Sequence, residues 1–195
     1  MRGEGTMALR VIADATDDSD YERTFAKMRL RLGESELVRV NTVDQVKDLL
    51  QRPLEVLMLS AHGRVHVAGG VNQHEVRIGG VWHPASEFSD ESRVQSPSIF
   101  VVDACDQKTD VAPGTAMDDW ARALPNLACI FVGQGGVIPS LSIEMAAVAA
   151  RMSDDPTFTV TRVGWPGHVP RSGYWFESTS AKACAGFTAV PRNTV

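Results

Sequence analysis

Short apolar runs alternate with amphipathic segments along most of this chain, and no other feature limits its fold as strongly. Runs such as residues 54–59 (LEVLML) and 98–102 (SIFVV) are too short for typical helices and carry little polar alternation. Such runs are typical of strands in a parallel sheet that is covered on both faces. The segments between them place apolar residues three and four positions apart, which predicts helices. The order of the elements therefore predicts an α/β fold with a mainly parallel central sheet.

The predicted elements follow one another without a long linker. Strands are predicted at residues 9–13, 36–40, 54–59, 98–102, 127–132 and 157–163, and helices at residues 21–32, 42–52, 84–94, 115–124 and 140–152. Residues 65–81 alternate apolar and polar side chains around paired glycines, which is typical of antiparallel hairpin strands. Gly33 and Pro53 mark the expected ends of the first two helices, and Thr42 is the expected N-cap of the second. Residues 133–136 (GQGG) are expected to form a turn.

Length and composition predict a single domain over residues 1–195, in which residues 1–8 form a flexible N-terminal extension. A net charge of −5 argues against a nucleic-acid partner, which would select a basic face. The sequence has neither an apolar stretch of about 18 residues nor the apolar core of a signal peptide, so no membrane span and no secretion are expected. The 3 cysteines are irregularly spaced, which fits reduced thiols and a cytoplasmic protein.

Two reactive side chains follow two of the predicted strands. His62 comes after the strand at residues 54–59, and Cys105 comes after the strand at residues 98–102. Because the carboxyl ends of neighbouring parallel strands meet at one edge of a sheet, both side chains are expected in one crevice. A histidine can act as the base that a thiol needs near neutral pH, and can then protonate a leaving amine. The backbone N–H groups of Gly63 and Cys105 are the expected oxyanion hole.

The other cysteines and histidines fit structural roles. A lone buried cysteine is more often an inert core residue, as Cys129 in the run LACIFV is expected to be. His66, His74 and His83 are irregularly spaced, and the chain has no CxxC or HExxH pattern, so no metal site is expected. Either His62 or Cys105 alone would also be read as structural, and it is their joint position after two strands that favours catalysis.

These two motifs resemble the caspase-like cysteine peptidases, which include caspases, metacaspases, legumains, gingipains, separases and bacterial CHAT domains. LEVLMLSAHG followed by PSIFVVDAC is similar to the signature of that group, in which one apolar strand ends in His-Gly and another ends in the catalytic cysteine. The resemblance implies a caspase-hemoglobinase fold, a three-layer αβα sandwich close in length to a minimal bacterial-type catalytic domain. It also implies peptide-bond hydrolysis by a dyad of His62 and Cys105, without a metal or an organic cofactor.

Asp103, two residues before the cysteine, raises a question about this dyad. A nearby negative charge raises the pKa of a thiol and opposes thiolate formation. Residues two apart on a strand share a face, so Asp103 is expected beside Cys105, and a buried carboxylate needs a cationic or hydrogen-bonding partner. The resemblance implies that this acid lines a specificity pocket for Arg, and less favourably Lys, before the scissile bond. The alternative is a turn-forming aspartate at the end of a strand.

Two further residues are candidates for the same pocket. Metacaspase-like pockets add a second acid from the region after the first strand, and residues 14–20 (DATDDSD) offer four aspartates, of which we favour Asp17. Acids before a helix are also ordinary complements of its dipole. Gln134, after the strand at residues 127–132, is a candidate for the rim of the pocket or a turn residue.

The sequence thus predicts a cysteine endopeptidase that acts on a protein or peptide substrate, with a possible activating partner protein. The alternative is a catalytically inactive caspase-like module that serves as a scaffold or recruits an effector. A third class, an unrelated α/β hydrolase or nucleotide-binding domain, rests on the glycine clusters alone. It has little support because no GxGxxG or GxxxxGK[ST] motif opens a helix after the first strand.

Overall fold

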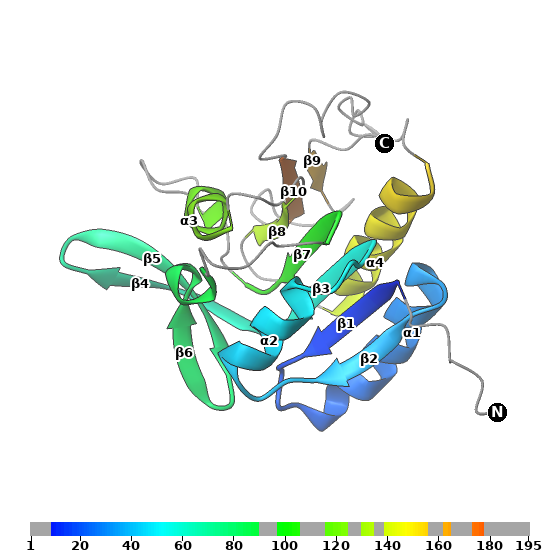
Figure 1. Ribbon diagram of the computed structural model, residues 1–195, viewed down its shortest axis with the longest axis horizontal. Coiled ribbons are helices and arrows are strands. Elements are labelled where there is room, and N and C mark those ends of the chain that lie inside the picture. The colour runs from blue at the N-terminus through cyan, green and yellow to red at the C-terminus, as the bar shows by residue number, and fades with distance from the viewer. Residues whose placement is uncertain are drawn as a thin grey trace.

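The computed structural model describes residues 9–89, 97–105, 116–124, 130–134, 139–155, 162–164 and 173–177 (Figure 1). Its larger sheet has the strand order β2-β1-β3-β7-β8-β10-β9. The bounds of these strands are β1 Arg10–Asp14, β2 Glu36–Arg39, β3 Val56–Ser60, β7 Ile99–Asp103, β8 Ile130–Gln134, β9 Arg162–Gly164 and β10 Gly173–Glu177. Strands β2, β1, β3, β7 and β8 run parallel, whereas β10 runs antiparallel to both β8 and β9. The prediction of an α/β fold with a mainly parallel central sheet is therefore confirmed.

Helices lie on both faces of this sheet. The helices are α1 Glu22–Leu32, α2 Val43–Leu50, α3 Ala116–Ala123 and α4 Pro139–Asp154, with short 3-10 turns η1 Ser19–Tyr21 and η2 Ala85–Phe88. Residues at even positions of β1 and β3, such as Ile12 and Met58, pack against α1 and α4. Residues at odd positions, such as Val11 and Leu57, pack against α2, η2 and α3. Strand alternation divides the core into two layers in this way, and the continuous burial of β3 and β7 follows from it.

A second, smaller sheet projects from the carboxyl end of β3 (Figure 1). It consists of β4 His62–Ala68, β5 Val71–Ile78 and β6 Val81–Pro84 in antiparallel order. Two glycine pairs form the turns, as predicted, and all four of these glycines have positive φ. At Gly79 a side chain is also excluded by space, because a Cβ atom there would lie 2.3 Å from the carbonyl oxygen of Asn41. The hairpin predicted at residues 65–81 is confirmed, but its first strand begins earlier, at His62.

Local signals in the sequence set most helix boundaries. Thr42 caps α2 through a capping box with Gln45, and Gly33 follows the last residue of α1 with φ 87°. Two predictions were wrong in detail. The helix expected at residues 84–94 begins as a single 3-10 turn at Ala85 and has ended by Ser89. Gly133 and Gln134, which were expected in a turn, are the last two residues of β8. Strand β10 was not predicted.

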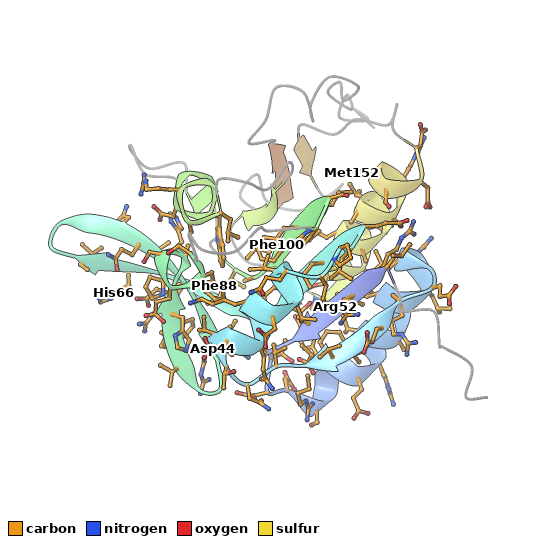
Figure 2. All side chains as sticks on the ribbon, in the orientation of Figure 1. Asp44, Arg52, His66, Phe88, Phe100 and Met152 are labelled. Atoms are coloured by element: carbon orange, nitrogen blue, oxygen red, sulfur yellow. The ribbon has the colours of Figure 1, made fainter. Side chains whose placement is uncertain are left out.

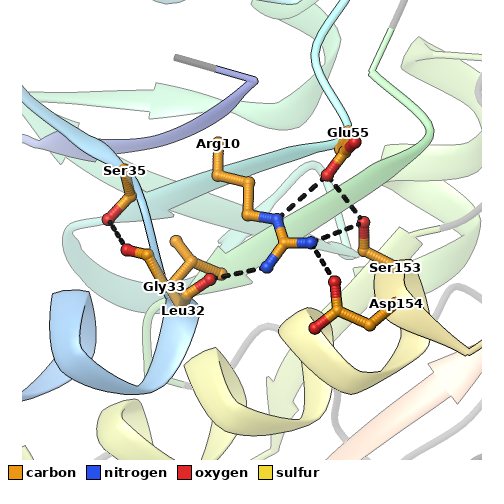
Figure 3. Close-up of polar contacts among 7 residues, drawn as sticks. All are labelled: Arg10, Leu32, Gly33, Ser35, Glu55, Ser153 and Asp154. Atoms are coloured by element: carbon orange, nitrogen blue, oxygen red, sulfur yellow. Dashed lines mark hydrogen bonds and ion pairs between the residues drawn. The ribbon is translucent and has the colours of Figure 1, made fainter.

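At the amino edge of the sheet, Arg10 ties several elements together (Figure 3). Its guanidinium donates hydrogen bonds to the Glu55 carboxylate at 3.0 Å and to the Leu32 carbonyl at 2.7 Å. It also bonds Ser153 and Asp154 at the end of α4. A cation is favourable at the carboxyl ends of α1 and α4, where the helix dipoles are negative. This cluster lies at the opposite edge from the carboxyl ends of the parallel strands, so it supports the fold and not the candidate site.

Candidate active site

Three polar residues form a row across the carboxyl ends of three neighbouring parallel strands. Asp14 of β1 is the register partner of Ser60 of β3, and Ser60 is the register partner of Asp103 of β7. All three are buried. They occupy the strand positions that face α1 and α4, because they continue the series to which Ile12, Met58 and Val101 belong. The sheet thus presents a polar row where its apolar core ends, at the edge where sites form in sheets of this kind.

In the sequence, His62 and Cys105 follow two members of this row. Each comes two residues after a member of the Ser60–Asp103 pair, so both pairs are separated by 43 residues. The ladder continues past the row, since the N–H of Ala61 donates to the carbonyl of Asp103 at 3.1 Å. This bond extends the contact between the two strands to Ala61, whereas the paired register itself ends at Ser60 and Asp103.

The environments of His62 and Cys105 differ. His62 is exposed and Cys105, a thiol outside any disulfide among the described residues, is half-buried. His62 was expected at the end of a central strand, whereas β3 ends at Ser60 and His62 is the first residue of β4, opposite Arg77. Gly63, the expected oxyanion donor, is also part of β4 and lies opposite Val76. The histidine thus belongs to the small sheet, whereas the cysteine lies in a turn two residues after the last residue of β7.

Asp103 is buried, and both of its carboxylate oxygens accept hydrogen bonds from this chain. Ser60 Oγ donates a hydrogen bond to its Oδ2 at 2.7 Å, and Ser142 Oγ of α4 donates to its Oδ1 at 2.8 Å. Burial raises the pKa of Asp103 from 3.8 to about 6, and the two serine hydroxyls oppose that shift because they stabilise the carboxylate. The hydrogen-bonding partner that a buried carboxylate needs is therefore present within the chain.

Tyr21, at the end of η1, lies close to both Asp103 and Cys105. Burial raises the pKa of its phenol to about 12, and the negative charges of Asp103 and Cys105 act in the same direction. A hydrogen bond with Ser142 has the opposite effect. Tyr21 is therefore close enough to both groups for their charges to affect its pKa.

The remaining pocket candidates lie near the same edge. Asp17, on the segment after β1, is exposed and has a left-handed φ of 56°. The buried acid of that region is Asp14, which accepts hydrogen bonds from the N–H of Thr16 at 2.9 Å and from its hydroxyl at 2.8 Å. Gln134 is the last residue of β8, next to β7 in the sheet, and not a turn residue.

Sequence reasoning missed three members of this site, namely Ser60, Ser142 and Tyr21. Ser60 carried a usable signal, since it precedes His62 by the same two positions by which Asp103 precedes Cys105. Tyr21 was assigned to the apolar face of α1, and Ser142 carried no signal within its helix.

Metal and membrane chemistry find no support in the described part of the chain. No group of three or more His, Cys, Asp or Glu residues there is arranged to hold a metal ion. Among the same residues, no helix combines the length and the apolar character needed to cross a bilayer. Cys129 and the segment after Cys105 lie outside the described residues.

No protein-family model matches this sequence, and no curated protein matches it either.

Proposed function

We propose that this chain has a caspase-hemoglobinase-like αβα fold and is a cysteine endopeptidase that uses His62 and Cys105. The observation that carries the proposal is the register. His62 and Cys105 each follow, by two residues, one member of a directly paired Ser60–Asp103 couple on adjacent parallel strands. A structural histidine and a structural cysteine have no reason to share that offset at the edge of the sheet where sites form.

In the proposed reaction, His62 accepts the proton of the Cys105 thiol and the thiolate attacks the carbonyl carbon of the scissile peptide bond. The backbone N–H groups of Gly63 and Cys105 stabilise the oxyanion that forms. The C–N bond then breaks as the imidazolium of His62 gives its proton to the leaving amine. Water, deprotonated by His62, hydrolyses the resulting thioester, which releases the acid product and restores the thiol. We place this reaction in the cytoplasm, where thiols stay reduced.

For specificity we propose an Arg, and less favourably a Lys, before the scissile bond, with Asp103 as the recognising acid. Each carboxylate oxygen can accept two hydrogen bonds, so one serine donor on each oxygen leaves acceptor capacity for a guanidinium. With a pKa of about 6, the carboxyl is mostly ionised at neutral pH, and its charge is enclosed by neutral hydroxyls. A substrate cation would stabilise that charge. Asp17 and Gln134 are proposed at the rim of the same pocket.

The test is hydrolysis of fluorogenic peptides ending in Arg, Lys, Asp or Leu. We expect turnover of the Arg peptide, with Lys next, and its loss in Cys105→Ala and His62→Ala. His66→Ala is the matched control, because His66 is a second exposed histidine farther along the same strand (Figure 2), and it should retain activity. Asp103→Asn should reduce the preference for Arg over Leu. Absence of Cys105-dependent turnover of all four peptides, with and without calcium, would refute the proposal.

A second candidate function is that of a catalytically inactive caspase-like scaffold. The observation that favours it is the placement of Asp103, whose charge opposes ionisation of the neighbouring Cys105 thiol and whose two oxygens already have partners in this chain. An acyloxymethyl ketone that bears Arg distinguishes the two candidates. Covalent labelling of Cys105 supports the peptidase, whereas no labelling, together with partner binding that Cys105→Ala leaves unchanged, supports the scaffold.

A further inference from the structure

Helix α3 contacts both sheets through two consecutive residues. Trp120 is fully buried and packs between Phe88 of η2 and Phe100 of β7, with ring centroids 5.0 Å and 5.6 Å away. Phe88 and Phe100 are labelled in Figure 2. Asp119, the preceding residue, bonds His74 of β5 in the small sheet. Figure 1 shows α3 between the small sheet and the β7–β8 side of the central sheet. This helix therefore connects the sheet that carries His62 with the strand that precedes Cys105.

The His74–Asp119 pair is a partly buried polar contact between these two parts of the molecule. His74 Nδ1 lies 2.8 Å from Asp119 Oδ2, and the side chain of His74 has no exposed surface. The other oxygen of Asp119 faces Arg122 at 3.2 Å, and the side chain of Arg122 is 74% exposed. His74 shares the inner face of β5 with Val76 and Ile78, which belong to the apolar core. A polar pair within such a core has a narrow range of acceptable geometries, whereas apolar side chains can slide past one another.

The pair is close in the sheet to the candidate catalytic histidine. His74 is the register partner of Val65 on β4, three residues after His62, and the same ladder continues to the His62–Arg77 pair. Among the residues that the structure describes, no strand of the small sheet pairs with a strand of the central sheet. Along the chain, the single residue Ala61 separates β3 from β4. The orientation of His62 relative to Cys105 therefore depends on what holds the small sheet in place, and the His74–Asp119 bond is directional.

We propose that the His74–Asp119 pair positions His62 against Cys105, an inference that rests on the proposed peptidase function. His74 is a positioning residue and does not touch the substrate, because it has no exposed surface. The pair fixes the small sheet against α3, and Trp120 fixes α3 against β7. Loss of the pair should let the small sheet shift and weaken the action of His62 on the thiol, while the hydrogen bonds of Asp103 to Ser60 and Ser142 stay intact.

Three variants separate positioning from stability. His74→Leu alone leaves the Asp119 carboxylate without its buried partner, so it should lower the thermal unfolding temperature. The double variant His74→Leu/Asp119→Leu replaces the polar pair with apolar groups, an exchange that is often neutral for stability. We expect it to unfold within a few degrees of the wild type. On the Arg peptide its kcat should fall to about one tenth of the wild-type value or lower, whereas its KM should stay within about twofold of the wild-type value. Arg122→Gln, which removes only the exposed partner of Asp119, should keep kcat within about twofold.

A second readout does not require peptide cleavage. The rate at which iodoacetamide alkylates Cys105 is measured from pH 5 to pH 9 in the wild type, in His62→Ala and in the double variant. If His62 acts on the thiol, the wild-type profile lies at lower pH than that of His62→Ala, and the profile of the double variant should move toward His62→Ala.

The outcomes separate the two proposals. A shifted alkylation profile without peptide cleavage by the wild type would support the positioning role and refute the peptidase. Wild-type kcat and a wild-type alkylation profile in the double variant would overturn the positioning role and leave the peptidase standing. Identical profiles for the wild type and His62→Ala would also overturn it, because His62 would then not act on Cys105.

Discussion

Replacement of Asp103 by asparagine tests whether this carboxyl is buried as the structure places it. Its pKa is about 6 in the folded protein against an ordinary value of 3.8. A carboxyl whose pKa is raised on folding binds its proton more tightly in the folded state. Its contribution to stability is therefore complete below pH 3.8 and is lost as the pH rises through about 6. Asparagine has nearly the same size and does not titrate, so Asp103→Asn removes this pH dependence.

The magnitude follows from the width of that pH window. Each pH unit between the unfolded and folded pKa values changes the free energy of unfolding by about 1.4 kcal/mol, so the full effect is about 3 kcal/mol. Between pH 4.5 and pH 8, the unfolding free energy of Asp103→Asn should rise relative to the wild type by roughly 2 kcal/mol. The new amide N–H groups face the serine hydroxyls and add an offset, but that offset does not vary with pH in this range.

The assay is urea unfolding followed by tryptophan fluorescence at several pH values and constant ionic strength. Ser142→Ala should move the wild-type transition to higher pH, because the hydrogen bond from Ser142 lowers the pKa of Asp103. Ser140→Ala, the same change two residues earlier on α4, is the matched control and should leave the pH dependence as in the wild type. Parallel stability curves for Asp103→Asn and the wild type would refute the burial and the enclosure of this carboxyl.

Three further changes test the fold by urea or thermal unfolding. Arg10→Met leaves two carboxylates and the end of α1 without their cation and should cost roughly 1–2 kcal/mol, because both carboxylates are partly exposed to solvent. A cost below about 0.5 kcal/mol would contradict the cluster in Figure 3. Thr42→Ala removes the cap of α2 and should cost about 1 kcal/mol, and no change would show that the capping box is dispensable. Gly70→Ala should cost about 1 kcal/mol, and Gly79→Ala should cost clearly more, because only a Cβ at position 79 would collide with Asn41. Equal costs for the two variants would contradict that contact.

Much of the parallel core was predictable from sequence because burial on both faces leaves a continuous apolar run. The five-residue strands β3 and β7 are buried throughout, and each was predicted within two residues of its observed bounds. The helical spacing of Phe25, Met28 and Leu32 likewise predicted the buried face of α1. In both cases the pattern is local, so a single sequence contains it.

Features that depend on distant partners left no such pattern. Strand β10 (GYWFE) has an apolar run of only three residues, and it pairs antiparallel with β8. The start of β4 at His62 was missed because no glycine or proline marks the corner at Ala61. The bond from Ser142 to Asp103 joins residues 39 positions apart, and it follows from how α4 lies on the sheet. The sequence therefore predicted the two strand ends of the site, but it did not predict the hydrogen-bonded burial of Asp103.

The enclosed acid determines what distinguishes the two candidate functions. At neutral pH the Tyr21 phenol, with a pKa of about 12, is an uncharged group, whereas Asp103 is largely ionised. The described surroundings of the Cys105 thiol therefore carry a negative charge that opposes thiolate formation. In the proposed reaction a substrate cation neutralises that charge as it binds, so recognition of the basic side chain and activation of the thiol are one event. If the proposals hold, the two functions differ in whether a substrate cation reaches Asp103.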